Sequence, residues 1–429
     1  MSVSSKFFSN SMQSAMSLLT WVDERWGNRV INMTGDNPDP TPYTRLPMLR
    51  QRGGVLRTYL MNGWFVLDHA YVQTLFRDKR LSAEITGNKL MNTVVRSAAR
   101  GLYVPSLENP HMLNRDAPDH TRLRKLTAKS FTNRFVQSMK PDIEQLVDDL
   151  LATAPADARE IDIVSLLAKP LPAIVIAQML GVPVEERHLF ERWSEDLLGY
   201  TKMLEPAAMQ AAVEADLAIL IYLQELTEDK RKNPGDDLIS KMIAAEEDGD
   251  KLSLEELYST CLLLLVAGHE TTTRLISSCL YLLLSNPAEL AKLQADRSLM
   301  AGAIEEALRI EPPVQAVARL VKEPFTFDGK KFKRGQLVTL SIAGANRDPA
   351  VIPEPETFNI SREDPPHISF GHGIHLCLGM PLARLEAEIA LNRLLDKYPA
   401  MSLATQNVSW EPNPFFRGLE TLVVRLRSE

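Results

Sequence analysis

The feature that most constrains the fold of this chain is one long apolar segment near its middle, from about Ser253 to Leu284. The spacing Ser253-x-x-Glu256 is that of a helix capping box, and Ser285-Asn286-Pro287 ends the apolar pattern. One helix over this range would be roughly 45 Å long, which is enough to cross a whole domain. Its centre is apolar on nearly every side, so we expect it to be buried, with the rest of the chain packed around it.

Helical periodicity dominates the remaining sequence, and strand-like segments gather near its two ends. The clearest helical patterns cover residues 135–154, 207–230 and 378–397. The strand-like segments are 55–60 and 64–67, which predict a hairpin, and also 325–342 and 421–426. The sequence therefore predicts a mainly α fold with a minor β region.

Composition and charge exclude several classes of protein. An apolar content of 45% and a charged content of 24% are ordinary for a soluble globular protein. The net charge of −7 argues against a dedicated nucleic-acid-binding protein, and the three cysteines fit a reducing compartment. No segment has the roughly 18 apolar residues that a membrane span needs, and the N-terminus lacks the pattern of a secretory signal. We therefore expect a cytoplasmic protein without a transmembrane anchor.

A glycine-rich run places one cysteine immediately before an apolar helix: Phe370-Gly371-His372-Gly373-Ile374-His375-Leu376-Cys377-Leu378-Gly379. No other cysteine lies near Cys377 in the sequence, which argues against a disulfide, a CxxC redox pair or a cysteine zinc site. The start of a helix suits one thiolate, because the helix dipole and free N–H groups stabilise negative charge. The alternative is a buried structural cysteine in a turn.

This run resembles the haem-binding segment of the cytochrome P-450 family, whose pattern is Phe-x-x-Gly-x-His/Arg-x-Cys-x-Gly. The resemblance implies a haem b cofactor with Cys377 as the axial ligand of the iron. The other haem contacts that it implies within the run are Phe370, Gly371 and Gly379.

The resemblance also implies the P-450 fold, an α-rich haem domain with a small β-rich subdomain. Segments that match the family run in its order from about Asp116 to Arg417. We therefore expect a single haem domain over residues 1–429, in which residues 1–40 form an extension of unassigned role.

The middle of the long apolar segment contains Ala267-Gly268-His269-Glu270-Thr271-Thr272. An acid beside a hydroxyl is costly in an apolar helix unless it is used, and threonine can bond to the carbonyl four residues earlier and bend the helix. The motif resembles the Ala-Gly-x-Glu/Asp-Thr segment of the family's distal helix. The resemblance implies that Glu270 and Thr271 deliver protons for dioxygen cleavage. The alternative is a local kink with Glu270 held in a salt bridge.

Two further sets of charged residues match the family by position. Glu306 and Arg309 lie three residues apart, and with Arg362 they resemble a structural charge cluster that fixes the cysteine loop. A haem has two propionates that need cationic partners. The residues that resemble such partners are His120, Arg124, Arg319 and His375, and the alternative for each is a solvated surface cation.

The resemblance implies a monooxygenase that uses O2 and takes electrons from a separate protein, a ferredoxin or flavodoxin with its reductase. The chain has no Gly-x-Gly-x-x-Gly dinucleotide fingerprint of its own. A basic cluster that could attract an acidic donor comprises Arg115, Arg122, Lys125 and Lys129, although it could equally be a solvated helix face.

The predicted substrate is an apolar small molecule: a terpenoid, steroid, fatty acid or polyketide. The residues that the resemblance places in its pocket are Met91, Leu263, Ala267, Gly268, Val314, Val317, Phe415 and Phe416. Two other functions remain open, a peroxygenase driven by hydrogen peroxide and a non-catalytic haem-thiolate sensor or carrier.

Overall fold

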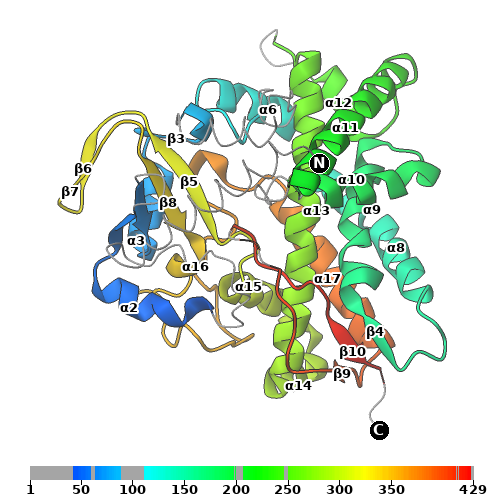
Figure 1. Ribbon diagram of the computed structural model, residues 1–429. Coiled ribbons are helices and arrows are strands. Elements are labelled where there is room, and N and C mark those ends of the chain that lie inside the picture. The colour runs from blue at the N-terminus through cyan, green and yellow to red at the C-terminus, as the bar shows by residue number, and fades with distance from the viewer. Residues whose placement is uncertain are drawn as a thin grey trace, which may run out of the picture.

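A computed structural model describes residues 42–58, 63–87, 111–197, 199, 206–245, 250–411, 413 and 415–426. The predicted extension 1–40 and the pocket residue Met91 lie outside these ranges. Helix α13 (Leu254–Ser285) runs through the whole molecule, with helices on one side and most strands on the other (Figure 1).

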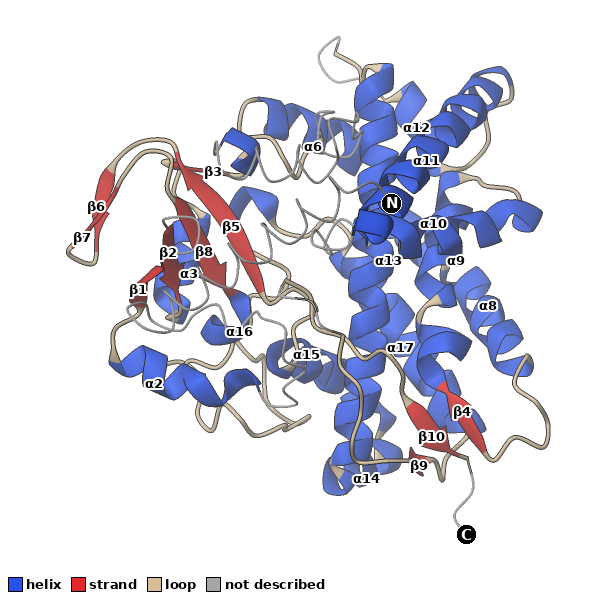
Figure 2. Ribbon diagram, viewed as in Figure 1, coloured by secondary structure: helices blue, strands red, loops and turns tan. Residues whose placement is uncertain are grey.

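Helices form most of the described structure (Figure 2). Besides α13 they are α2 (Leu46–Gln51), α3 (His69–Phe76), α6 (Asp119–Ser130), α7 (Asn133–Ser138), α8 (Lys140–Ala152), α9 (Pro170–Leu180), α10 (Arg187–Leu197), α11 (Pro206–Lys232), α12 (Leu238–Ala244), α14 (Pro287–Ala295), α15 (Met300–Ile310), α16 (Ile342–Ala345) and α17 (Met380–Lys397). The strands are β1 (Val55–Thr58), β2 (Gly63–Val66), β3 (Leu81–Ser82), β4 (Glu160–Asp162), β5 (Ala316–Val321), β6 (Phe325–Phe327), β7 (Lys330–Phe332), β8 (Leu337–Ser341), β9 (Ser402–Leu403) and β10 (Val423–Arg425).

The predicted long helix is confirmed together with its start signal. The Ser253 hydroxyl accepts from the Glu256 N–H at 3.2 Å, and the Glu256 carboxylate accepts from the Ser253 N–H at 2.9 Å. Along its length α13 packs against α9, α10, α11, α15 and α17. Most of its apolar side chains are buried, and Cys261, Leu265 and Cys279 are 0% exposed. Burial of most of the helix surface explains why the apolar pattern has no continuous polar stripe.

The strands form a separate layer with its own core. The largest sheet has the order β1-β2-β8-β5-β3, in which β2 and β8 are parallel and the other neighbours antiparallel. The predicted hairpin is confirmed as β1 and β2, which pair from Val55 opposite Val66 to Thr58 opposite Gly63. A small sheet β4-β10-β9 holds the C-terminal strand, and β6 and β7 form a ribbon. The mainly α fold with a minor β region is therefore confirmed.

Two local expectations were wrong. The predicted helix over 135–154 is two helices, α7 and α8, because Pro141 has no N–H for the fourth preceding carbonyl and its ring crowds that group. Strand β5 was not predicted, although it lies inside the largest sheet. The four residues between its buried ends are all half-buried, so the strand lacks the apolar–polar alternation that marks a one-sided strand.

Among the described helices, one is long and apolar enough to cross a membrane. It is Ala207–Lys232 of α11, with a mean hydropathy of 1.2 over its most apolar window. In the fold this helix packs against α10, α12 and α13. A helix in the interior of a water-soluble protein meets the same test of length and composition, so the test alone does not assign it to a membrane.

The capping box at the start of α13 gives a stability prediction. Ser253→Ala removes the acceptor of the Glu256 N–H and should lower the free energy of unfolding by about 1 kcal/mol. Ser361→Ala, at an exposed serine outside any helix, is the control and should have little effect. Chemical denaturation followed by circular dichroism measures both. Equal stability of the two variants would contradict the contribution of the cap.

Candidate active site

The cysteine loop lies between β8 and α17 in sequence and delivers Cys377 three residues before the helix starts. Gly371 and Gly373 have φ of +74° and +73°, a left-handed conformation that glycine adopts without strain. The loop is closed by the Cys377 N–H, which donates to the Phe370 carbonyl at 2.9 Å. Cys377 is exposed, whereas Cys261 and Cys279 are buried. Of the three sulfurs, only that of Cys377 is therefore accessible to a ligand.

The surroundings of the Cys377 sulfur act on its charge in opposite directions. The thiol can be reached by solvent but lies deep among protein atoms, and this burial raises its pKa above the ordinary value. The backbone N–H groups of Gly379 and Met380 and the positive charges of Arg124 and Arg384 lower the pKa. These four groups would stabilise a thiolate, and a bound metal ion would do so more strongly.

Helix α13 carries the predicted acid–alcohol pair in an unbroken helical stretch. The Thr271 hydroxyl donates to the Ala267 carbonyl at 2.7 Å, the bond that the sequence predicts. Ala267 is exposed and Leu263 is half-buried, so both can contribute to a cavity wall. At Gly268, a Cβ would lie 2.8 Å from the Ile176 side chain of α9, and the place of Gly268 in the substrate pocket stays a prediction. Its lack of a side chain lets α9 pack closely against α13.

Glu270 is buried and takes part in a salt bridge, which the sequence left open as the alternative to a proton carrier. Its carboxylate accepts from the guanidinium of Arg274, one turn further along α13. Its other oxygen lies 3.6 Å from Nδ1 of His269. The His269 ring is neutral near pH 7, because burial lowers its pKa to about 4. Glu270 is therefore anchored by one cation, Arg274.

The four predicted propionate partners come from three elements. His120 and Arg124 are on α6, Arg319 is on β5 and His375 is in the cysteine loop. The rings of His120 and His375 lie 4.3 Å apart between centroids. Burial lowers the pKa of Arg319 to about 10 and, with the neighbouring Arg319 and His120, that of His375 to about 3.

Among the described residues, no carboxylate forms an ion pair with any of these four side chains. Both ring nitrogens of His120 are buried without a hydrogen-bond partner there. Within the same ranges no ion pair involves Arg124 or Arg319, whose recorded side-chain hydrogen bond goes to the Ala318 carbonyl. Asp116, which raises the pKa values of Arg319 and His375, pairs with Lys322 at 3.2 Å. The half-buried guanidinium groups of Arg124 and Arg319, beside two imidazole rings that can donate hydrogen bonds, suit an anionic ligand such as a pair of propionates.

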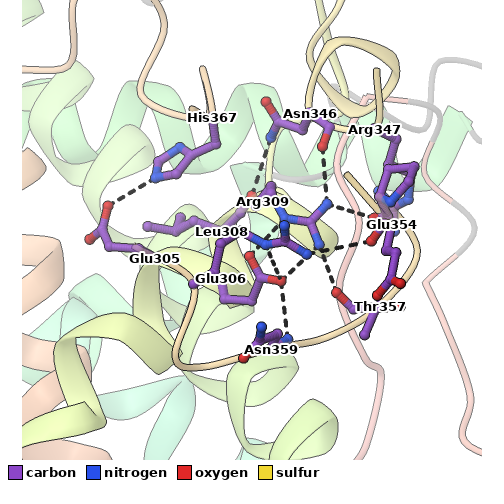
Figure 3. Close-up of polar contacts among 12 residues, drawn as sticks. Glu305, Glu306, Leu308, Arg309, Asn346, Arg347, Glu354, Thr357, Asn359 and His367 are labelled. Carbon is purple, nitrogen blue, oxygen red and sulfur yellow. Dashed lines mark hydrogen bonds and ion pairs between the residues drawn. The ribbon is translucent and has the colours of Figure 1, made fainter. Parts of the chain in front are cut away.

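Glu306 and Arg309 form a fully buried ion pair on α15, shown in Figure 3. The Arg309 guanidinium makes five hydrogen bonds: two to the Glu306 carboxylate and three to the carbonyls of Asn346, Pro355 and Thr357. Arg362 donates to Glu306 at 3.3 Å, so the three residues that the sequence groups together do meet.

The same network reaches the start of the cysteine loop. The Asn346 side chain accepts from the Ile368 N–H at 2.9 Å and donates to the Ser369 hydroxyl at 2.8 Å. Glu305, beside the pair, accepts from Arg384 and His367, and these hydrogen bonds outweigh burial and hold its pKa near 2. Charged groups therefore hold the loop from both ends.

Contacts in the structure bring only some of the predicted pocket residues together. Val314 and Phe416 face each other across a β-bridge, and Val317 lies on β5. Phe415 is 37% exposed and its carbonyl accepts from the Gln315 N–H at 2.9 Å. These residues form one group beside β5, while Leu263 and Ala267 belong to α13.

The predicted basic cluster needs one correction. Arg122 donates to the Glu256 carboxylate and lies 3.4 Å from Asp250, so it joins α6 to the start of α13. Its charge is already compensated and is not available to a docking partner in the way expected. Lys125 and Lys129 are exposed, and Arg115 is half-buried.

Arg274 and Glu386 are among the buried charged residues that sequence reasoning missed. Arg274 is 1% exposed and pairs with both Glu270 and Glu411. Glu386 on α17 is 1% exposed, one of its oxygens has no partner in the described ranges, and burial raises its pKa well above the ordinary value. Their only sequence signal is a charge inside an apolar helix, which does not identify the partner.

Comparison with known proteins agrees with this geometry. The family model described as Cytochrome P450 matches residues 106–414. The chain is 41% identical over 370 residues to Cytochrome P450 107B1 of Saccharopolyspora erythraea, covering 85% of this chain and 89% of that protein. It is 39% identical over 394 residues to Cytochrome P450 monooxygenase PikC of Streptomyces venezuelae, covering 90% and 91%. The solved structure of the polyketide synthase cytochrome P450 PksS of Bacillus subtilis 168 matches with a TM-score of 0.80 and 36% identity, over 90% of this chain and 97% of that one.

The chain belongs to the cytochrome P450 family of haem-thiolate monooxygenases. Members of this family bind haem b. The residues present fit that group, since the iron requires an accessible cysteine sulfur and the propionates require basic side chains such as Arg124, Arg319 and the buried His120, whose ring nitrogens have no partner in the described ranges.

The assignment of the iron ligand can be tested with the three cysteines. Cys377→Ser removes the thiolate donor, so the reduced carbon monoxide complex should lose its thiolate-type absorption spectrum. Cys261→Ala and Cys279→Ala should retain haem and that spectrum, because burial raises the pKa of both thiols far above neutrality. A thiolate-type spectrum in the Cys377→Ser variant would contradict the assignment.

The buried ion pair should matter more for folding than for chemistry. Glu306→Ala or Arg309→Ala leaves an uncompensated buried charge and should cost about 3–5 kcal/mol in the free energy of unfolding, with poorer haem retention. The control is Arg393→Ala, at a half-buried surface cation near Glu144 and Asp148, which should change stability little. A stable holoprotein with a normal Tm for either core variant would contradict the structural role.

Proposed function

We propose that this P450 uses Cys377, Glu270 and Thr271 to oxidise an apolar small molecule with O2, and that it receives electrons from a separate ferredoxin or flavodoxin. The observation that supports it most is a carboxylate beside a hydroxyl in the middle of an apolar helix, in a chain with one accessible cysteine. Haem with a thiolate ligand supplies the activation and cleavage of dioxygen.

The protein residues have distinct tasks in this proposal. The Gly379 and Met380 N–H groups favour the charged form of the Cys377 sulfur, against the burial that raises its pKa. The Thr271 hydroxyl, which donates to the Ala267 carbonyl at rest, turns to hold a proton toward the cavity. Glu270 carries the next proton, for which its carboxylate has to rotate away from Arg274. The apolar residues of α13 and β5 keep the site poor in water.

The substrate is proposed as an apolar small molecule of lipid or polyketide type. Relatives with related sequences include a protein named 6-deoxyerythronolide B hydroxylase and one named vitamin D(3) 25-hydroxylase. Related structures hold corticosterone in one case and a hexadecenoic acid carried by acyl carrier protein in another. The pocket residues predicted from the sequence are all apolar or small, which agrees with any of these classes.

The electron donor is proposed to dock through the remaining basic residues of the predicted cluster. Arg115, Lys125 and Lys129 are candidates, and the two lysines are exposed on α6. An acidic ferredoxin or flavodoxin would be attracted to such a group, and association should slow as salt increases. With such a donor we propose that the enzyme works in the cytoplasm.

The electron source separates the proposal from its two alternatives. Product formation should need the ferredoxin and reductase system with O2. A peroxygenase would give comparable product with hydrogen peroxide alone, and a sensor or carrier would give product with neither. A screen of steroids, fatty acids and macrolactones, which follows the change in iron spin state on binding, would then narrow the substrate class.

Thr271 gives the sharpest test of the proton-delivery role. Thr271→Ala should still bind haem, substrate and oxygen, since those steps do not use the hydroxyl. Reductant should be consumed while hydrogen peroxide is released in place of product, so the ratio of product to reductant should fall at least roughly tenfold. Thr271→Ser keeps the hydroxyl and is the control. A tightly coupled Thr271→Ala enzyme would exclude the role.

A further inference from the structure

Arg274 joins the proposed proton carrier to the segment that bears the pocket aromatics. It lies one turn after Glu270 on α13 and is 1% exposed. One terminal nitrogen of its guanidinium donates to the Glu270 carboxylate and to the Glu270 carbonyl, the latter at 2.9 Å. The other terminal nitrogen donates to the carboxylate of Glu411, 137 residues further along the chain.

Glu411 belongs to a narrow segment that we call the C-terminal loop, defined by the described residues 410, 411, 413 and 415–419. Trp410 and Leu419 face each other in a β-bridge at its base, and the Glu411 N–H donates to the Gly418 carbonyl at 3.0 Å. The loop carries Phe415 and Phe416. In Figure 1 this red segment crosses α13, where the Arg274–Glu411 bond joins the two.

The loop is fitted around Arg274 at two further points. The Arg274 guanidinium lies 5.3 Å from the centre of the Phe416 ring. A Cβ at Gly418 would be 2.4 Å from Arg274 Cγ, so only glycine allows the backbone to approach this closely. A displacement of the loop must therefore change the contacts of Arg274.

Within this cluster of described residues, the single cation Arg274 pairs with two carboxylates, Glu270 and Glu411. His269, which lies beside Glu270, does not supply a second positive charge near neutral pH. The groups that act on the Arg274 charge are Glu270 and Glu411. Because both carboxylates attract the same guanidinium from different sides, a shift of this group toward one carboxylate lengthens and weakens its bond to the other.

We propose that Arg274 is a positioning residue through which the C-terminal loop controls how firmly Glu270 is held. The bond to Glu411 is the easier one to exchange for water, since the Glu411 side chain is 23% exposed and that of Glu270 is 9% exposed. When the loop closes, Glu411 binds Arg274 more tightly, and Arg274 then binds Glu270 less tightly. When the loop opens, Glu411 is hydrated and Arg274 holds Glu270 alone. Substrate that closes the loop thus frees the proton carrier, a consequence that rests on the proposed role of Glu270.

Because coupling between two sites is reciprocal, the link can be tested without turnover. Glu270→Gln removes the competing charge, so Arg274 should bind Glu411 more tightly. Amide hydrogen exchange in peptides covering residues 410–419 of the holoprotein should then slow by roughly three- to tenfold. Arg274→Lys cannot bridge both carboxylates with one ammonium group, so exchange there should become faster than in the parent.

The control is Glu388→Gln, at an exposed carboxylate on α17, which changes the net charge equally and should leave exchange in 410–419 unchanged. Unchanged or faster exchange in Glu270→Gln would overturn the proposal. This result does not depend on whether Glu270 carries protons, so it is separate from any failure of the proposed function.

A double-mutant comparison tests the consequence for turnover. Glu411→Gln should lower the ratio of product to reductant roughly three- to tenfold in the parent, because Arg274 then holds Glu270 more firmly. In the Glu270→Gln background the same change should have no effect on that ratio. An equal loss in both backgrounds would show that Glu411 acts on the loop alone and would overturn the proposal, as would no loss in the parent.

Discussion

The buried guanidinium of Arg309 joins α15 to the chain segments that lead toward the cysteine loop. A charge at 0% exposure is tolerated only when its donors are satisfied, and here Glu306 and three backbone carbonyls accept five hydrogen bonds. The close approach this requires is built into α15, since a Cβ at Gly302 would lie 2.4 Å from the Ile360 carbonyl. Glycine at position 302 lowers the helix propensity of α15, but it lets the segment that carries the accepting carbonyls come within reach of Arg309.

Sequence reasoning succeeded where a feature depends on residues close together in the chain. The capping box of α13, the bond from Thr271 to Ala267 and the pairing of Glu306 with Arg309 each span three or four residues. The cysteine loop was equally accessible, because its glycines and the helix that follows are adjacent in sequence. Arg362 was found only through the resemblance to a family, since nothing near it in the chain points to Glu306.

The same reasoning failed where the partner lies far away in the sequence. Arg122 was expected on an open basic surface, but Glu256 lies 134 residues further on and compensates its charge. Arg274 was not singled out from the sequence, because its partner Glu411 lies 137 residues further along the chain. Strand β5 was missed because the partial burial of its four central residues depends on neighbours that only the fold brings together. The sequence does not identify the substrate for the same reason, because the shape of the pocket depends on side chains from several distant elements.

Glu256 makes two contacts that together join α13 to α6. The same carboxylate caps the first turn of α13 and binds Arg122 of α6, the helix that carries His120 and Arg124. The contact between α13 and the helix that carries these basic side chains is thus held by an ion pair at the start of α13. The Arg122 side chain is 32% exposed there, so dissolved ions screen this bond more than the buried ones. We therefore expect the contact between α6 and α13 to weaken as ionic strength rises.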